Sequence, residues 1–191
     1  MHSWQEIASK LLNNFLMKKV TSFLIVIFIV AFTASFVSPD KEKINWITIQ
    51  QLDEMYSKNP KPILLDVYTD WCGWCKEMDR TTYKNENVVA YINEHYYAIR
   101  LNAESTERFV FNNKKYGYNE KYKSNELAEF LLFGRMEFPT TVFLPTIDAR
   151  PAPLGGYLKP KEMEAPLKYF GEGAYKTKTF VEFNKELKPK W

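Results

Sequence analysis

The sequence predicts a mixed α/β fold built around one central sheet. Two short apolar runs, residues 62–68 (PILLDVY) and 140–144 (TTVFL), have the length and the β-branched or aromatic content of buried strands. Segments with helical spacing of apolar residues lie between and after them, so helices and strands alternate along the chain. Aromatic residues make up 16% of the 191 residues, which is enough to fill the core of one domain.

Six elements are expected up to residue 101, and they end in a strand–helix–strand unit. They are a strand at 46–49, a helix at 50–57, the apolar strand at 62–68, helices at 73–81 and 87–95, and a strand at 96–101. The helix at 50–57 is closed by Asn59-Pro60, because the residue before a proline disfavours helical backbone. Three tyrosines are expected in the core, namely Tyr68, Tyr96 and Tyr97.

The segment after residue 102 is less regular. Residues 108–118 alternate in polarity around Asn112-Asn113, which favours a hairpin. Ser124 is expected to cap a helix that ends at Gly134. The side chains expected on its buried face are those of Leu127, Phe130 and Leu131.

One more strand and two helices should complete the chain. Residues 151–157 contain the expected last strand and its Gly-Gly turn. Helices are expected at 161–170 and 179–187. Pro166 should lie in the first turn of the former helix or kink it.

The charge of the globular region argues against nucleic-acid binding. Residues 1–38 contain three lysines and one acid, so 23 of the 26 basic and 22 of the 23 acidic residues remain for residues 39–191. A region so close to neutral has no basic stripe for a phosphate backbone. Seven glycines, ten prolines and two cysteines also exclude collagen-like, low-complexity and disulfide-scaffold chains.

Residues 1–38 have the composition of an export leader. The uncharged apolar run 20–37 follows two lysines and precedes a polar segment that begins at Pro39. This order is typical of a signal peptide or a signal anchor, and the length of the run is compatible with both. The lysines before the run predict that residues 39–191, the single domain, lie outside the cytoplasm, in the periplasm or cell envelope.

Two questions about the leader stay open. The signal for cleavage is weak, because a cut after Ala34 would place the bulky Phe32 three positions before it. If the leader is not cleaved, it anchors the protein in the membrane. Met17 is an alternative start to Met1.

The only two cysteines of the chain, Cys72 and Cys75, occur in a Cys-Gly-Trp-Cys motif. They follow a buried strand and open a helix, where unpaired backbone N–H groups and the helix dipole stabilise a thiolate. Cys75 lies on the same helix face as Cys72 and can form a disulfide with it. A thiolate that attacks and a neighbour that resolves are the minimum for dithiol–disulfide exchange.

Other uses of two cysteines fit the sequence less well. A structural disulfide across so short a loop constrains the unfolded chain little. A zinc site needs four ligands, whereas the globular region offers only His95 besides the cysteines. Haem attachment needs a histidine directly after the second cysteine, where this chain has Lys76. No metal or cofactor is therefore expected, and a module that binds Cu(I) or a protein partner is the alternative.

Residues 65–75 (LDVYTDWCGWC) resemble the active-site stretch of the thioredoxin superfamily. Further segments that carry the resemblance are Arg100-Leu101-Asn102 at the end of the next strand, Phe138-Pro139-Thr140 at the cis-proline loop, and the glycine bend Gly155-Gly156. The resemblance covers about residues 46–170. It implies a thioredoxin-like three-layer fold, in which helices flank a central mixed sheet.

The resemblance also implies roles for individual residues. Asp66 matches the acid buried beneath the disulfide, and it would exchange protons with Cys75. Pro139 would be cis and would face the disulfide. The residues that would bind the substrate are Trp71, Gly73, Trp74, Phe138, Pro139 and Thr140.

Two departures from ordinary thioredoxins refine this interpretation. The dipeptide Gly73-Trp74 replaces Gly-Pro, and it is similar to envelope thioredoxin-like proteins and to the C-terminal domain of the membrane disulfide reductase. The stretch from Arg100 to Pro139 is longer than a minimal member needs, so residues 103–137 are expected to be an inserted hairpin and helix before the cis-proline loop. We therefore expect an envelope thiol–disulfide oxidoreductase working as a reductase, or alternatively as an oxidase or isomerase. Its partners would be protein disulfides and an upstream thiol reductant.

Physical chemistry adds expectations for the charged and aromatic side chains. Asp66 interrupts an apolar strand, so we expect an unpaired buried carboxylate with a raised pKa. Arg100 is expected to be a solvated charge at a strand end. Trp71 and Trp74 are expected to be exposed indoles that form a docking surface beside the thiols.

Overall fold

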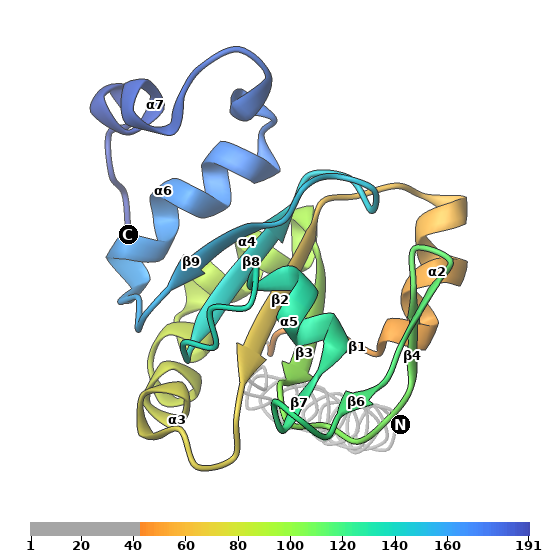
Figure 1. The fold of residues 1–191 in the computed structure, drawn as a ribbon. Coiled ribbons are helices and arrows are strands. Elements are labelled where there is room, and N and C mark those ends of the chain that lie inside the picture. The colour runs from red at the N-terminus through yellow and green to blue at the C-terminus, as the bar shows by residue number, and fades with distance from the viewer. Residues whose placement is uncertain (1–42) are drawn as a thin grey trace, which may run out of the picture. The chain divides into compact units, whose positions relative to one another are not determined.

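A five-stranded mixed sheet forms the centre of the fold in the computed structural model, which describes residues 43–191 (Figure 1). The strands, in sheet order, are β1 (Trp46–Ile47), β3 (Tyr97–Asn102), β2 (Ile63–Tyr68), β8 (Thr140–Leu144) and β9 (Ala152–Gly155). The first three run parallel, β8 is antiparallel to β2, and β9 is antiparallel to β8. The leader 1–38 with its apolar run 20–37 lies outside the described residues.

Helices cover both faces of the sheet, because strand β2 sends alternate side chains to opposite sides. Leu65 and Val67 belong to a core cluster shared with α2 (Ile49–Lys58) and α5 (Glu126–Leu131). Leu64 belongs to the other cluster, which it shares with α3 (Gly73–Arg80), α4 (Glu86–His95) and α6 (Pro160–Gly171). A sheet buried on both faces explains the continuous apolar run in β2. The predicted three-layer α/β fold is confirmed.

Local sequence signals set the helix boundaries. The side chains of Thr48 and Gln51 form a capping box at the start of α2. Asn85 accepts N–H groups at the start of α4. The same kind of box, formed by Thr179 and Glu182, starts α7 (Phe180–Glu186). These helices begin within one residue of the positions that the sequence predicts.

The segment before the cis-proline loop contains the predicted hairpin and helix. Strands β4 (Phe109–Phe111) and β5 (Lys114–Tyr116) pair through a turn at Asn112 and Asn113, whose φ angles are 48° and 59°. Two positive φ angles define the turn that best matches the twist of a hairpin, and asparagine tolerates them. A second short pair, β6 (Tyr118–Asn119) and β7 (Ser124–Asn125), leads into α5.

The expectations for α5 were wrong in two details. Its N-cap is Asn125, whose side chain accepts the N–H of Leu127 at 3.0 Å, whereas Ser124 lies in β7. Phe130 is 40% exposed, because the buried face follows the i, i+4 pair Leu127 and Leu131. The ring of Phe130 packs instead near that of Tyr116, with 5.8 Å between the centroids.

Helix α6 also begins within one residue of the expected position, and it contains Pro166 in its interior. Pro160 occupies the first turn, and the carboxylate of Glu162 accepts the N–H of Lys159 at 2.8 Å, so the helix starts at residue 160. Pro166 lies in the interior of the helix and not in its first turn, and its side chain is buried, which offsets its poor helix propensity.

A buried acid on α6, Glu164, forms hydrogen bonds with the backbone of Lys190 and Trp191. The carboxylate of Glu164 is fully buried and accepts Lys168 Nζ at 2.6 Å and the N–H groups of Lys190 and Trp191 at 2.8 and 3.1 Å. Burial alone would raise the pKa of Glu164, but these donors lower it below its ordinary value. Within residues 43–191, no helix combines the length and apolarity needed to cross a membrane.

Candidate active site

The two cysteines form a disulfide at the N-terminus of α3. Their Cα atoms are 5.3 Å apart, and both residues are buried, with 4% and 3% of their surface exposed. Strand β2 ends at Tyr68, and a turn closed by the hydrogen bond from Cys72 N–H to the carbonyl of Thr69 leads into the helix. Cys72 is the N-cap, and its sulfur accepts the N–H of Cys75 at 3.0 Å. When the disulfide is reduced, this N–H can stabilise a thiolate on Cys72.

Two exposed tryptophans flank the disulfide. Trp71 and Trp74 expose 67% and 64% of their surface, as the sequence predicts. The ring of Trp71 meets Phe138 edge to face with 6.0 Å between the centroids, and Trp74 stacks on Tyr157 at 5.6 Å. Each indole is therefore held against the scaffold on one side while its other side faces solvent. This leaves apolar surface on both sides of the cysteines.

A cis-proline loop lies next to the motif. The Phe138-Pro139 peptide bond is cis, as the resemblance implies, and the contact between Trp71 and Phe138 brings the loop to the motif. The carbonyl of Pro139 accepts the N–H of Gly156 at 2.8 Å. Gly156 has a φ of 98°, a conformation that side chains strongly disfavour. Thr140, the first residue of β8, donates its hydroxyl to the carbonyl of Glu137 at 2.8 Å.

Open space surrounds the middle of the motif. A Cβ added to Gly73 would meet no atom within 4 Å, so the backbone beside the cysteines is accessible to a partner chain. Trp71 borders this space and is held by a residue at the start of the long segment after β3. Glu104 accepts the indole N–H of Trp71 at 3.0 Å. Glu104 is in turn fixed by its own N–H, which donates to the side chain of Asn102 at 2.9 Å.

The buried acid is part of an ion-pair network and is not unpaired as expected. Asp66 is 2% exposed, and its Oδ2 accepts Nε of Arg100 at 3.2 Å. Nη2 of Arg100 donates to Asp79 at 2.9 Å. The expectation of a solvated Arg100 was also wrong, because strand pairing places it directly beside Asp66. Its guanidinium lies 4.5 Å from the centroid of the Tyr68 ring. Tyr68 was expected in the core, but it is half-buried and belongs to neither core cluster, whereas Tyr96 and Tyr97 are buried as expected.

Burial dominates the electrostatics of Asp66. It raises the pKa of the carboxyl from 3.8 to about 6, although Arg100 acts in the opposite direction. Among the described residues, Oδ1 of Asp66 and the buried hydroxyls of Tyr83 and Thr141 form no hydrogen bond of good geometry. The hydroxyl of Tyr83 nevertheless lies close enough to Asp66 to lower its pKa slightly. Asp66 can therefore change its protonation state near neutral pH, with one oxygen free to accept a proton.

The network connects Asp66 to the helix that carries the cysteines. Asp79 follows Cys75 by four residues, so both lie on the same side of α3. Strand pairing places Arg100 and Thr141 on either side of Asp66 in one row across the sheet. The sequence patterns did not point to Asp79, Tyr83, Glu104 or Tyr157. Only Asp79 had a usable signal, namely an acid one helical turn after the second cysteine.

The described part of the chain contains no cluster of three or more His, Cys, Asp or Glu side chains placed to hold a metal ion. The site consists instead of a disulfide at a helix N-terminus, a cis-proline loop beside it and a buried acid on the neighbouring strand. On a mixed five-stranded sheet, these features define the thioredoxin class of proteins.

Comparison with known families agrees with this class. A family model described as "Thioredoxin-like domain" matches residues 49–171, which is more than half of the chain. The chain therefore belongs to the thioredoxin-like domain family.

Individual relatives are similar over shorter stretches or at low identity. The thiol:disulfide interchange protein DsbD of Pectobacterium atrosepticum is 40% identical over 40 residues, which are 21% of this chain and 7% of that protein. The chain thus spans a small fraction of that relative's length. A thioredoxin-fold protein from Helicobacter pylori has a similar structure, with a TM-score of 0.52 and 19% identity over 78% of this chain and 86% of that one. The structure of a DsbH oxidoreductase gives a TM-score of 0.50 and 18% identity over 71% and 90% of the two chains. These two structures support the fold.

Proposed function

We propose that this protein is a thiol–disulfide oxidoreductase that reduces disulfides of proteins in the cell envelope. The observation that carries the proposal is the Cys72–Cys75 disulfide at the N-terminus of α3, beside the cis-proline loop. The name of the DsbD relative, a thiol:disulfide interchange protein, supports the same chemistry. The leader supports the location, because two lysines precede its apolar run.

The reaction would proceed in two exchanges. The thiolate of Cys72 attacks one sulfur of a substrate disulfide, so that a mixed disulfide forms and the other substrate sulfur leaves as a thiolate. Cys75 then loses its proton and attacks the sulfur of Cys72, which restores the Cys72–Cys75 disulfide and releases the second substrate thiolate. Two electrons pass from the dithiol to the substrate. An upstream thiol reductant would reduce the protein again.

Asp66 would accept the proton of Cys75 in the second exchange. Its pKa of about 6 leaves most of the carboxyl ionised at pH 7, and its Oδ1 has no competing hydrogen bond of good geometry among the described residues. Arg100 would act as a positioning residue, because it holds the other oxygen of Asp66 and links it to Asp79 on α3.

The substrate would bind as an extended segment along the cis-proline loop. Trp71, Gly73 and Trp74 would form one side of this docking surface. Phe138, Pro139 and Thr140 would form the other side. The exposed indoles lie on both sides of the accessible backbone of Gly73. Such a surface suits an unfolded or flexible partner more than a rigid one.

Variants of the two tryptophans test this surface. Trp71→Ala and Trp74→Ala should each lower kcat/KM for a protein disulfide by about tenfold, as expected for loss of an aromatic anchor. They should leave turnover of a small disulfide, such as oxidised glutathione, within about twofold, because that substrate contacts little beyond the sulfur. Val181→Ser, which alters another exposed apolar residue, is the matched control and should change neither rate. Equal losses for both substrates would argue against a docking surface.

Reduction of insulin by the full chain tests the activity itself. With dithiothreitol as the electron source, the protein should accelerate the precipitation of insulin chains, and Cys72→Ser should abolish the acceleration. Addition of copper should not be required. Stoichiometric Cu(I) binding by the reduced protein without any acceleration would favour a metal-binding module instead.

A further inference from the structure

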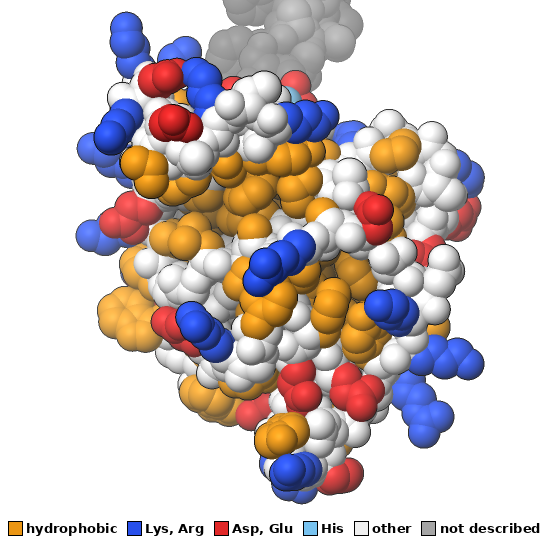
Figure 2. Space-filling view, turned by 45° about the horizontal axis from the view of Figure 1, so that its top comes forward, with side chains coloured by type: hydrophobic (Ala, Val, Ile, Leu, Met, Phe, Trp, Pro, Cys, Tyr) orange, Lys and Arg blue, Asp and Glu red, His pale blue; other side chains and the backbone are white. Residues whose placement is uncertain are grey.

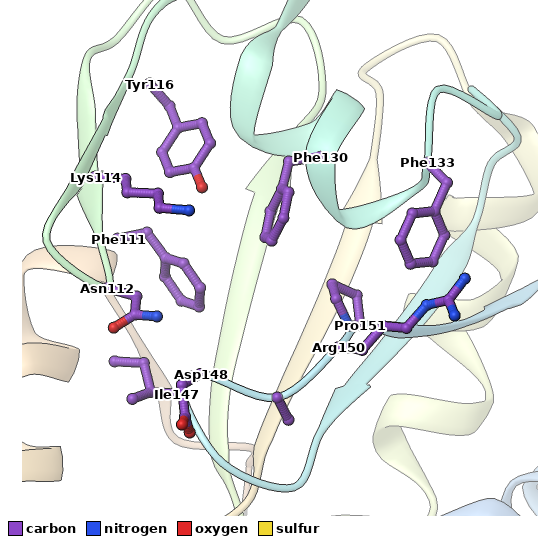
Figure 3. A pocket seen from close by; sticks show the side chains of 11 residues that line it. Phe111, Asn112, Lys114, Tyr116, Phe130, Phe133, Ile147, Asp148, Arg150 and Pro151 are labelled. Atoms are coloured by element: carbon purple, nitrogen blue, oxygen red, sulfur yellow. The ribbon is translucent and has the colours of Figure 1, made fainter.

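A second candidate site lies between the long segment after β3 and the loop that joins β8 to β9 (Figure 3). It is a pocket of about 340 Å³, which lies in the range of pockets that bind small molecules. We call it the insert pocket and define it by six of its lining residues: Phe111, Lys114, Tyr116, Phe130, Phe133 and Arg150. Nothing in the proposed exchange reaction uses these residues.

The insert pocket lies at the end of the sheet opposite to the disulfide. Thr140 pairs with Val67, close to the motif, whereas Leu144 pairs with Ile63 at the other end of β2. The β8–β9 loop, which contributes residues 147–151 to the pocket, follows Leu144. A ligand in the insert pocket would therefore leave the cysteines accessible.

Aromatic rings form the floor and walls of the insert pocket. Phe111 is 1% exposed, and its ring lies at the base, whereas Phe130 and Phe133 are 40% and 49% exposed. The ring of Tyr116 lies 5.8 Å from that of Phe130, at a tilt of 35°. Two large apolar side chains exposed in one hollow indicate a binding site more than scattered surface phenylalanines would. Several ring faces at differing angles suit a flat, aromatic ligand.

Two cations lie on the insert pocket without a carboxylate partner among residues 43–191. Lys114 points from β5 into the pocket, whereas Arg150 lies on the other side of the lining, where its guanidinium is 5.1 Å from the centroid of the Phe133 ring and points away from Lys114 (Figure 3). The acid in the lining, Asp148, accepts the hydroxyl of Thr146 at 2.7 Å, a bond that lowers the pKa of Asp148. With Asp148 ionised, the lining keeps a net charge of +1, which favours an anion.

The hairpin register shows that Lys114 belongs to the pocket face. Lys114 pairs with Phe111, the residue at the base of the pocket, whereas Lys115 pairs with the exposed Val110. Paired residues share a face and neighbours along a strand alternate, so the two lysines point to opposite sides of the hairpin. Figure 2 shows one face of the molecule, on which hydrophobic side chains gather with Lys, Arg, Asp and Glu side chains among and around them.

We propose that the insert pocket binds a small aromatic carboxylate. Its ring would contact Phe111, Tyr116 and Phe130, and its carboxylate would be neutralised by Lys114. A lysine beside several ring faces selects this chemistry. A neutral aromatic compound would leave Lys114 without a counter-charge, and an aliphatic acid would leave the ring faces without an aromatic partner.

Titration of the ¹⁵N-labelled full chain with 2-naphthoate tests the proposal by NMR. A ligand of this size should bind with a Kd of about 1 mM or below. Backbone shifts should concentrate in β4, β5 and residues 147–151. The neutral analogue 2-naphthylmethanol should bind at least about fivefold more weakly, because it lacks the charge-assisted hydrogen bonds.

Three variants separate the insert pocket from unspecific association. Lys114→Gln should weaken binding of 2-naphthoate at least about fivefold, whereas Arg150→Gln and Lys115→Gln should each leave it within about twofold. All three change partly or fully exposed side chains, and a thermal unfolding curve confirms that each variant is folded. Equal binding by Lys114→Gln and Lys115→Gln would overturn the proposal. So would shifts that concentrate around Trp71, or in the separate apolar hollow lined by Phe143 and Pro166.

Discussion

Replacement of Asp66 by asparagine should change how the stability of the protein depends on pH. Burial raises the pKa of Asp66 from 3.8 to about 6, so the folded state binds this proton more tightly than the unfolded chain does. The stabilisation that results is fully present below about pH 4, and it is lost as the pH rises through about 6. Above this range the folded protein holds a buried carboxylate that the unfolded chain would expose to water.

The difference between the two pKa values sets the magnitude. It corresponds to about 3 kcal/mol between the two protonation states of the carboxyl. The free energy of unfolding of Asp66→Asn, relative to the wild type, should therefore rise by about 3 kcal/mol between pH 4 and pH 8. The substitution also removes the ion pair with Arg100, which changes the free energy of unfolding further. Asparagine does not titrate, so the variant itself has no pH dependence from this position.

Urea unfolding of the oxidised protein at pH 4, 5, 6, 7 and 8 measures this difference, because the disulfide then removes the thiols from the titration. Asp70→Asn is the matched control, because Asp70 is exposed at the end of the same stretch and its replacement should change stability by less than about 0.5 kcal/mol. A difference between Asp66→Asn and the wild type that stays constant from pH 4 to pH 8 would show that folding does not raise the pKa of Asp66. A difference that falls with pH would show that Arg100 outweighs burial.

Three further predictions concern the exchange reaction and the fold. Cys75→Ser should accumulate mixed disulfides with client proteins and Cys72→Ser should not, as seen on non-reducing gels; the opposite pattern would reverse the two roles. Asp66→Asn should slow the resolution step at pH 7 and leave the rate of the first attack unchanged, and rapid-mixing kinetics separates the two steps. Resolution by the variant at the wild-type rate would show that Asp66 is not the proton acceptor. Glu164→Ala leaves Lys168 and two backbone N–H groups without their acceptor, so it should destabilise the protein by about 3 kcal/mol in urea unfolding. A loss below about 1 kcal/mol would show that water replaces the carboxylate.

The sequence predicts the features that depend on local chemistry. The apolar runs of β2 and β8, the two asparagines of the hairpin turn and the Cys-Gly-Trp-Cys motif each carry their signal within a few residues. The position of the motif after a strand and at a helix start is also readable, because both elements have clear patterns.

Features that depend on strand register and packing could not be read in the same way. The pairing of Arg100 with Asp66 requires the alignment of β3 with β2, which no local pattern specifies. The exposure of Phe130 depends on how the six-residue helix α5 is rotated about its axis. The spacing of its apolar residues is compatible with burial of Phe130 as well as of Leu127 and Leu131, so the sequence alone does not fix this rotation. Pro166 lies inside α6 because buried contacts outweigh its propensity, and propensity was the only information available.

The reduction potential of the Cys72–Cys75 pair decides whether this protein donates electrons to substrate disulfides. The full chain is equilibrated with glutathione buffers of known ratio, and the oxidised fraction is measured by trapping free thiols. A protein that reduces substrate disulfides should have a potential near the reducing end of the thioredoxin-fold range, about −270 mV. A potential near −120 mV would rule out a reductase, because such a pair accepts electrons from substrate thiols and acts as an oxidase.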